Sequence, residues 1–71
     1  MKYEEVVSLL GYAGDHEQPV RITLSGATEV VGVPTSLDTH IAAHEVYLRP
    51  IGVEDTEIAL SLGDIHQVEL L

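Results

Sequence analysis

Strict alternation of apolar and polar side chains over residues 20–25 is the feature that most constrains this fold. Val20, Ile22 and Leu24 fall on one face of an extended segment, and the polar residues between them fall on the other. A period of two is typical of a strand with one buried face. Residues 57–62 repeat the pattern. The chain is therefore expected to form an antiparallel sheet that is solvated on one side.

One helix and five strands account for the remaining periodicity. Residues 2–10 place Tyr3, Val6, Val7 and Leu10 on one helical face, and Gly11 is the expected C-terminal stop. The predicted strands cover approximately residues 20–25, 28–35, 44–49, 57–62 and 66–71.

Glycines mark the expected bends and turns. Gly26 precedes the second strand, and Gly32 interrupts it, which indicates a bulge or sharp bend. Residues 54–56 are expected to form a turn, whereas residues 36–43 fit a loop, a helical turn or a longer second strand. Closing short antiparallel strands into a barrel removes exposed edges, so residues 1–71 are expected to form one small bent barrel.

Composition narrows the classes of function. The 71 residues include 12 acidic and 3 basic ones, a formal charge of −9, and no cysteine. A single copy therefore has no basic stripe to neutralise phosphates, which argues against nucleic acid as a partner. Thiolate metal sites and disulfides are excluded. No apolar run is long enough to span a membrane and no signal peptide is evident, so a cytoplasmic protein is expected.

Three segments together resemble the Sm-like small-barrel family of the SH3-like group. They are the strand at residues 20–24 with Gly26 after it, the mid-strand Gly32 with residues 36–38 beyond it, and Gly63-Asp64 before the last strand. The resemblance implies a helix followed by five bent strands. It also implies RNA contacts at positions that correspond here to Asp38, His40, Gly63 and Asp64.

Two positions depart from the family's RNA-binding pattern. The family's RNA-contacting asparagine corresponds to Ala42 or Ala43, and the arginine before its Gly-Asp turn corresponds to Leu62. These apolar side chains supply neither base-edge hydrogen bonds nor a cation. The resemblance also implies assembly, in which the last strand of one subunit pairs with the penultimate strand of the next. The candidate interface residues are Ile58, Leu60, Val68 and Leu70.

Histidine spacing raises a metal alternative. His40 and His44 are four residues apart and Glu45 follows, but two ligands fall short of the three or four that a zinc site uses. His40, His44 and His66 also form a hypothetical pH sensor of subunit contacts, because histidine titrates near pH ~6.5. No nucleophile elbow or phosphate loop occurs, so no enzymatic activity and no cofactor are expected.

The sequence therefore predicts a non-enzymatic interaction module of Sm-like fold that associates with itself through its edge strands. An RNA-binding Sm-like protein with an altered binding face is one alternative. A small metal-binding domain that uses His40 and His44 is the other.

Overall fold

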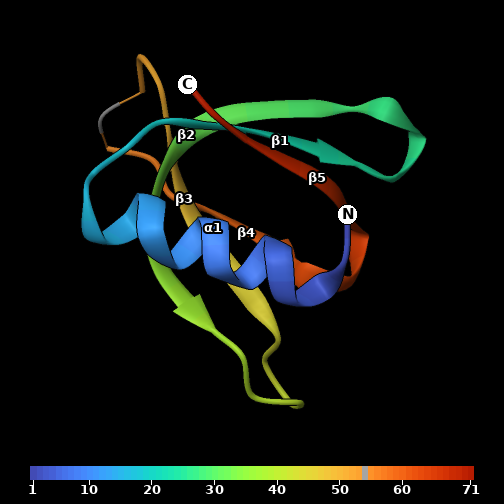
Figure 1. The fold of residues 1–71 in the computed structure, drawn as a ribbon. Coiled ribbons are helices and arrows are strands. Elements are labelled where there is room, and N and C mark those ends of the chain that lie inside the picture. Colours follow the sequence, from blue (N-terminus) through green and yellow to red (C-terminus); the bar gives the residue numbers. More distant parts are fainter. Residues whose placement is uncertain (54) are drawn as a thin grey trace.

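The computed structural model of the chain describes residues 1–53 and 55–71. A helix precedes five strands, which confirms the prediction of a mostly β chain with an N-terminal helix (Figure 1). The elements are α1 (Tyr3–Asp15), β1 (Val20–Leu24), the 3₁₀ turn η1 (Ser25–Ala27), β2 (Glu29–Asp38), β3 (Glu45–Pro50), β4 (Ile58–Ser61), the 3₁₀ turn η2 (Leu62–Asp64) and β5 (Ile65–Leu70).

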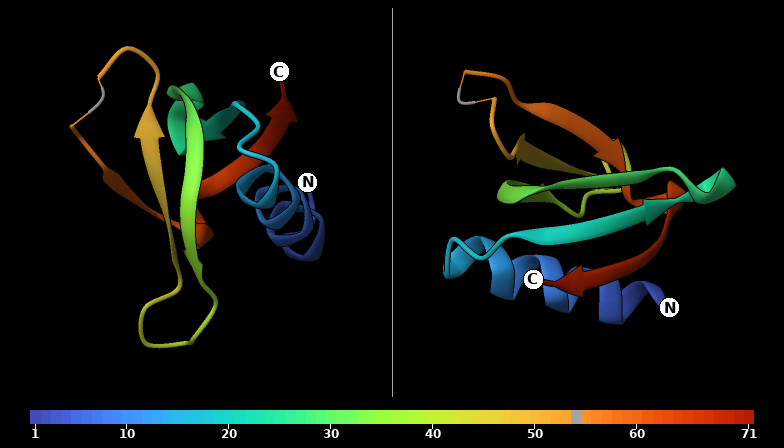
Figure 2. Two further views of the ribbon diagram at one scale, coloured as in Figure 1. Left: turned by 90° about the vertical axis from the view of Figure 1, so that its left-hand side faces the viewer. Right: turned by 90° about the horizontal axis from the view of Figure 1, so that it is seen from above.

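The five strands form one antiparallel sheet in the order β4-β3-β2-β1-β5. The sheet curves strongly, and α1 packs against β2 and β5 (Figure 2). In the described residues no ladder joins β4 to β5, so both are edge strands and the sheet is open. The predicted closure into a barrel is therefore not confirmed.

The core lies between α1 and the concave face of the sheet. Val6, Leu10 and Ala13 supply the buried stripe of the helix, at 0–2% exposure. Their spacing of four and three residues keeps them on one helical face. They pack with strand and turn residues that are also buried, namely Val20, Ile22, Val46, Leu48, Leu62, Ile65 and Val68.

The helix is longer than predicted. It continues through Gly11 to Asp15, because Ala13 extends the buried stripe by a turn. The end is a Schellman arrangement in which the Gln18 amide donates to the Ala13 carbonyl at 2.8 Å and the Glu17 amide donates to the Gly14 carbonyl at 3.4 Å. Glu17 holds the left-handed position with φ 50°, where glycine is usual. A glutamate gives no stop signal in the sequence, so the predicted stop at Gly11 was wrong.

β2 is also longer than predicted, and its irregularity lies elsewhere. Residues 36–38 continue the strand, and residues 39–44 form the β2–β3 turn, which settles the open assignment of residues 36–43. The ladder with β3 shifts register between Pro34 and Ser36 rather than at Gly32. Gly32 has a different role, because a Cβ atom there would lie 2.5 Å from the Arg49 carbonyl oxygen. The glycine therefore permits a close approach of β2 to β3.

The remaining boundaries differ from the predictions by at most one residue. β3 begins at Glu45 and includes Pro50, whereas β4 ends at Ser61 because η2 begins at Leu62. Glu54, in the predicted turn at residues 54–56, lies outside the described residues. The only helix of the described chain, α1, is too short to cross a membrane.

Candidate functional site

Two turns that carry the candidate RNA-contacting residues lie at the same end of the sheet. Asp38 ends β2 and His40 lies in the β2–β3 turn, while Gly63 and Asp64 lie in η2. The Leu62 amide donates a hydrogen bond to the His44 carbonyl at 3.0 Å, which joins η2 to the β2–β3 turn. The fold therefore brings together two segments that are separated by a whole hairpin in the sequence.

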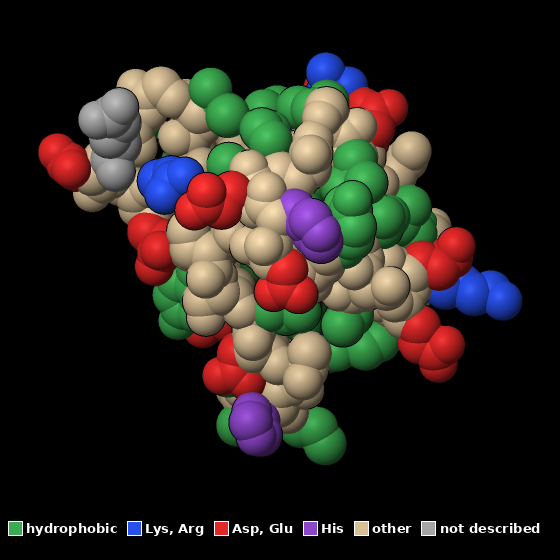
Figure 3. All heavy atoms as spheres, turned by 60° about the vertical axis from the view of Figure 1, so that its left-hand side comes forward, with side chains coloured by type: hydrophobic (Ala, Val, Ile, Leu, Met, Phe, Trp, Pro, Cys, Tyr) green, Lys and Arg blue, Asp and Glu red, His purple; other side chains and the backbone are tan. Residues whose placement is uncertain are grey.

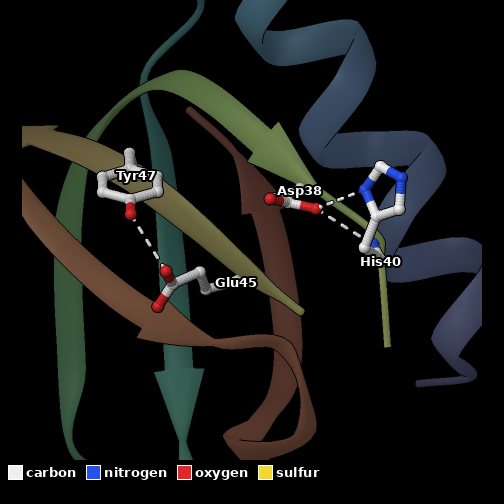
Figure 4. Close-up of polar contacts among 4 residues, drawn as sticks. All are labelled: Asp38, His40, Glu45 and Tyr47. Atoms are coloured by element: carbon white, nitrogen blue, oxygen red, sulfur yellow. Dashed lines mark hydrogen bonds and ion pairs between the residues drawn. The ribbon is translucent and has the colours of Figure 1, made fainter. Parts of the chain in front are cut away.

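Asp38 and His40 form a local pair in this region (Figure 4). The His40 backbone amide lies 3.0 Å from Asp38 Oδ1, and the ring Nδ1 lies 2.9 Å from the same oxygen. The amide hydrogen bond, followed by that of the ring, lowers the pKa of the Asp38 carboxyl from its ordinary value. The His40 side chain is 89% exposed, and Asp38 contacts only its Nδ1.

Tyr47 is surrounded by carboxylates on the outer face of the sheet. Its hydroxyl donates to Glu45 Oε1 at 2.9 Å, and that hydrogen bond raises the pKa of the phenol (Figure 4). The charges of Asp38 and Glu57 act in the same direction. Glu57 is itself held by the Thr35 hydroxyl, at 2.7 Å. An aromatic side chain in this setting favours cations and repels phosphates.

The molecular surface agrees with this local picture. Acidic side chains are spread over the face seen in Figure 3, with few lysine or arginine side chains between them. Arg21, one of three basic side chains, pairs with Glu69 on the neighbouring strand at 2.5 Å. Base-stacking platforms combine aromatic residues with cations. Tyr47 lacks such a setting, although Arg49 lies two residues along the same strand.

The two histidines proposed as metal ligands have different partners. His40 binds Asp38, whereas the His44 ring stacks on Tyr3 with centroids 5.1 Å apart and planes 9° apart. His44 adopts φ 45°, a left-handed conformation, and its amide donates to the His40 carbonyl at 2.8 Å. Across residues 1–53 and 55–71, no three histidine or carboxylate side chains gather as a metal site. His66, the third histidine of the hypothetical pH sensor, is exposed on β5.

The free edge of β5 carries the backbone groups of Val68 and Leu70. Hydrogen-bonded and non-hydrogen-bonded pairs alternate along an antiparallel ladder. The Leu71 amide donates to the Pro19 carbonyl at 3.0 Å, which makes this pair a hydrogen-bonded one. Because every second pair along this ladder is hydrogen-bonded, the pairs of Val68 and Leu70 are not. Their amides and carbonyls therefore point away from β1.

The same argument assigns the free edge of β4. Because the Leu62 amide bonds the His44 carbonyl, the backbone groups of Ala59 and Ser61 point away from β3. Ile58 and Leu60 alternate with these residues along β4, and their side chains are half-buried. The described chain thus presents two edges with unpaired backbone donors and acceptors, one at each end of its strand order.

The predicted interface residues differ in what they offer a partner. Leu70 is 40% exposed, and Ile58 and Leu60 are half-buried, so each has apolar surface left to cover. Val68 is 2% exposed and packs within its own core, so only its backbone is available. Val68 and Leu70 are two residues apart on β5 and share one face of the strand, but Leu70 lies where the core ends.

Sequence reasoning missed the Tyr47 network and a groove beside α1. The spacing of Glu45 and Tyr47 does signal a shared strand face. The position of Glu57 depends on the register between β3 and β4, which the sequence does not specify. The groove runs along Leu10, Gly11 and Gly14, and the predicted helix ended at the first of these residues. No known protein family and no curated protein sequence matches the chain.

Proposed function

We propose that this chain is a non-enzymatic assembly module that associates with copies of itself through its sheet edges. The observation that carries the proposal is the strand order, which leaves β4 and β5 as the two edges of one open sheet. Pairing β4 of one copy with β5 of the next continues the sheet from subunit to subunit. This is the assembly that the Sm-like resemblance implies.

Both edges carry backbone amides and carbonyls that have no strand partner within the described chain. Ala59 and Ser61 on β4, and Val68 and Leu70 on β5, direct their amides and carbonyls outward. Such rows of unpaired backbone groups are templates for strand addition, and native proteins usually protect an exposed edge strand with charges, a covering segment or a paired strand. The partly exposed side chain of Leu70 adds apolar area that pairing would bury.

Charge opposes this association at low ionic strength. Each copy carries a formal charge of −9, so neighbouring copies repel one another. Salt screens that repulsion, with a Debye length of about 10 Å at 0.1 M. We therefore expect the oligomer to strengthen as salt rises, which is the opposite of the response of a complex held by phosphate contacts.

Replacing Ser61 by proline tests the β4 edge directly. Ser61 is exposed and has φ −67°, an angle that the proline ring adopts without strain. The Ser61→Pro variant therefore loses the outward amide while its ladder with β3 stays intact. Ser61→Ala is the matched control, because it removes the hydroxyl and keeps the amide.

Multi-angle light scattering and sedimentation velocity then measure the number of subunits. The wild type and Ser61→Ala are expected to form the same oligomer, and Ser61→Pro is expected to dissociate with an unchanged circular dichroism spectrum. A wild type that stays monomeric at all salt concentrations contradicts the proposal. So does a Ser61→Pro variant that is folded and associates like the wild type.

RNA binding is the second candidate function, and one observation favours it. The Leu62–His44 hydrogen bond brings Asp38 and His40 to the same end of the sheet as Gly63 and Asp64, as the Sm-like pattern requires. Filter binding to short single-stranded RNA tests it. Retention at low salt that falls steeply with added salt would support phosphate contacts. The absence of retention at any salt concentration would leave assembly as the proposed function.

A further inference from the structure

The outward backbone groups of the two edge strands belong to opposite faces of the sheet. On β4 they belong to Ala59 and Ser61, whose side chains are exposed on the outer face. On β5 they belong to Val68 and Leu70, on the face that Val68 buries in the core. Directly opposed residues of a ladder direct their side chains to the same face. Any antiparallel pairing of these groups therefore joins the outer face of one copy to the core face of the next.

The same backbone groups determine how the two edges meet. In an antiparallel ladder, opposed residues exchange both of their hydrogen bonds. Ala59 can then be set opposite Leu70. Ser61, two residues further along β4, is set opposite Val68, so the amides and carbonyls of all four residues find partners. The slanted bonds of a parallel ladder cannot satisfy these four residues among themselves. We propose that β4 of one copy and β5 of the next pair antiparallel in this one register.

We call the contact between residues 58–61 of one copy and residues 68–71 of the next the joint. The joint covers apolar side chains that the fold leaves exposed at its edges. Leu70, which is 40% exposed, lies beside Ala59, and Leu71, which is 49% exposed, lies opposite the half-buried Ile58. A shift of two residues in one direction would set Leu70 opposite Glu57, and a shift in the other would carry Ala59 beyond the last residue of β5. Apolar burial therefore selects the proposed register.

The joint carries little charge in a chain whose formal charge is −9. Residues 58–61 contain no ionisable side chain, and residues 68–71 contain only that of Glu69. The register sets Glu69 opposite Leu60, and Arg21 on the neighbouring β1 pairs with the Glu69 carboxylate at 2.5 Å. One of the three basic residues thus neutralises the only acidic side chain at the joint. A second copy is the partner that these edges fit, because neither edge meets an uncompensated like charge.

The change of face at each joint determines the shape of the assembly. Within one copy the sheet curves over α1 (Figure 2). Because the core face of the next copy continues the outer face of the first, the curvature reverses at every joint. Each copy therefore keeps its own core and its own helix. This inference rests on the proposed edge pairing and adds its direction and its register.

Disulfide trapping tests the register, because the chain has no cysteine of its own. The Leu70→Cys variant is mixed under mild oxidation with Glu57→Cys, Ala59→Cys or Ser61→Cys, and all four positions are exposed. The Cβ atoms of opposed residues lie about 4.5–5.5 Å apart, and diagonal neighbours lie about 7–8 Å apart. The proposed register predicts the fastest cross-linking with Ala59→Cys. Faster cross-linking with either of the other two variants would overturn it.

A second mixture tests the direction of pairing. The antiparallel joint places Ala59 and Glu69 on opposite faces, so Ala59→Cys and Glu69→Cys should cross-link only at the rate of random collision. A parallel ladder would keep both on the outer face, and their rapid cross-linking would overturn the proposal. A wild type that stays monomeric at every salt concentration refutes edge pairing itself. An oligomer that cross-links in another combination refutes only the direction or the register.

Sedimentation equilibrium tests whether Glu69 lies at the joint. The Arg21→Gln variant leaves its carboxylate uncompensated and is expected to associate about fivefold more weakly than Arg49→Gln. Arg49→Gln is the matched control, because it removes the same charge from β3, which is not an edge strand. The double variant Arg21→Gln with Glu69→Gln should recover the association. Equal association of the two single variants would take Glu69 out of the contact and overturn the register.

Discussion

The contact between β2 and β3 at Gly32 gives the sharpest test of the fold. An alanine Cβ at this position would lie 2.5 Å from the Arg49 carbonyl oxygen, and 3.0 Å from both the Arg49 carbonyl carbon and Leu48 Cγ. The first distance is far below van der Waals contact, and the atom concerned belongs to the backbone. Leu48 is fully buried and has little space to move. The Gly32→Ala variant therefore has to separate two central strands.

The expected loss of stability follows from this overlap. Overpacking of a well-packed interior costs about 1–3 kcal/mol. The lower entropy of an unfolded chain with alanine returns about 0.4–1 kcal/mol of this. The middles of the two ranges give a net loss of about 1.3 kcal/mol. This lowers the melting temperature by roughly 5–10 °C, since each kcal/mol corresponds to about 4–8 °C in a domain of this size.

Thermal unfolding followed by circular dichroism measures the effect, at one protein concentration because self-association stabilises the folded state. Gly11→Ala is the matched control, since its Cβ meets nothing within 4 Å and it lies within α1. That variant should gain about 0.5–1 kcal/mol through helix propensity. If Gly32→Ala melts at or above the wild-type temperature, the close approach of β2 and β3 is wrong.

Three further predictions concern the helix end and the two pKa shifts. Glu17→Gly should raise the free energy of unfolding by about 1 kcal/mol, because glycine adopts the left-handed position of Glu17 without strain, and urea denaturation measures this. The pKa of Tyr47 is raised, so its hydrogen bond with Glu45 stabilises the fold below the phenol's ordinary pKa and is lost as pH rises. The Glu45→Gln variant should therefore show a lower Tyr47 pKa in an ultraviolet absorbance titration. The pKa of Asp38 is lowered, so the hydrogen bonds from His40 to Asp38 stabilise the turn above the ordinary carboxyl pKa and are lost as pH falls. The His40→Ala variant keeps the amide hydrogen bond and loses the ring contact. An NMR titration should therefore show a higher Asp38 pKa in this variant than in the wild type.

The strands were predictable because their alternation directly records which face is buried. Val20 and Ile22 are both fully buried, as their spacing requires. The end of α1 was not predictable, because Glu17 occupies a position where glycine is the recognisable signal. Gly32 was correctly singled out, but the bulge expected there lies between Pro34 and Ser36, and the missing side chain of Gly32 lets β2 approach β3 closely.

The candidate sites were predictable in part. The sequence could place Asp38 and Asp64 at the ends of strands, but only the tertiary hydrogen bond from Leu62 to His44 unites their turns. The free edges depend on strand order, which local patterns do not encode. The groove beside Gly11 and Gly14 depends on a helix end that a non-glycine cap conceals.

The strand order also has a kinetic consequence. β1 lies beside β5, so Arg21 and Glu69, 48 residues apart, must meet, whereas Thr35 and Tyr47 across β2 and β3 are only 12 residues apart. Two doublings of loop length add about 1.2 kcal/mol of closure entropy. Both the β1–β2 and the β2–β3 hairpins join residues close in sequence, so folding is expected to begin with these hairpins and to end when β5 docks. The last strand to join is also a free edge, so the newly folded chain acquires both halves of its proposed edge contact only at the final step.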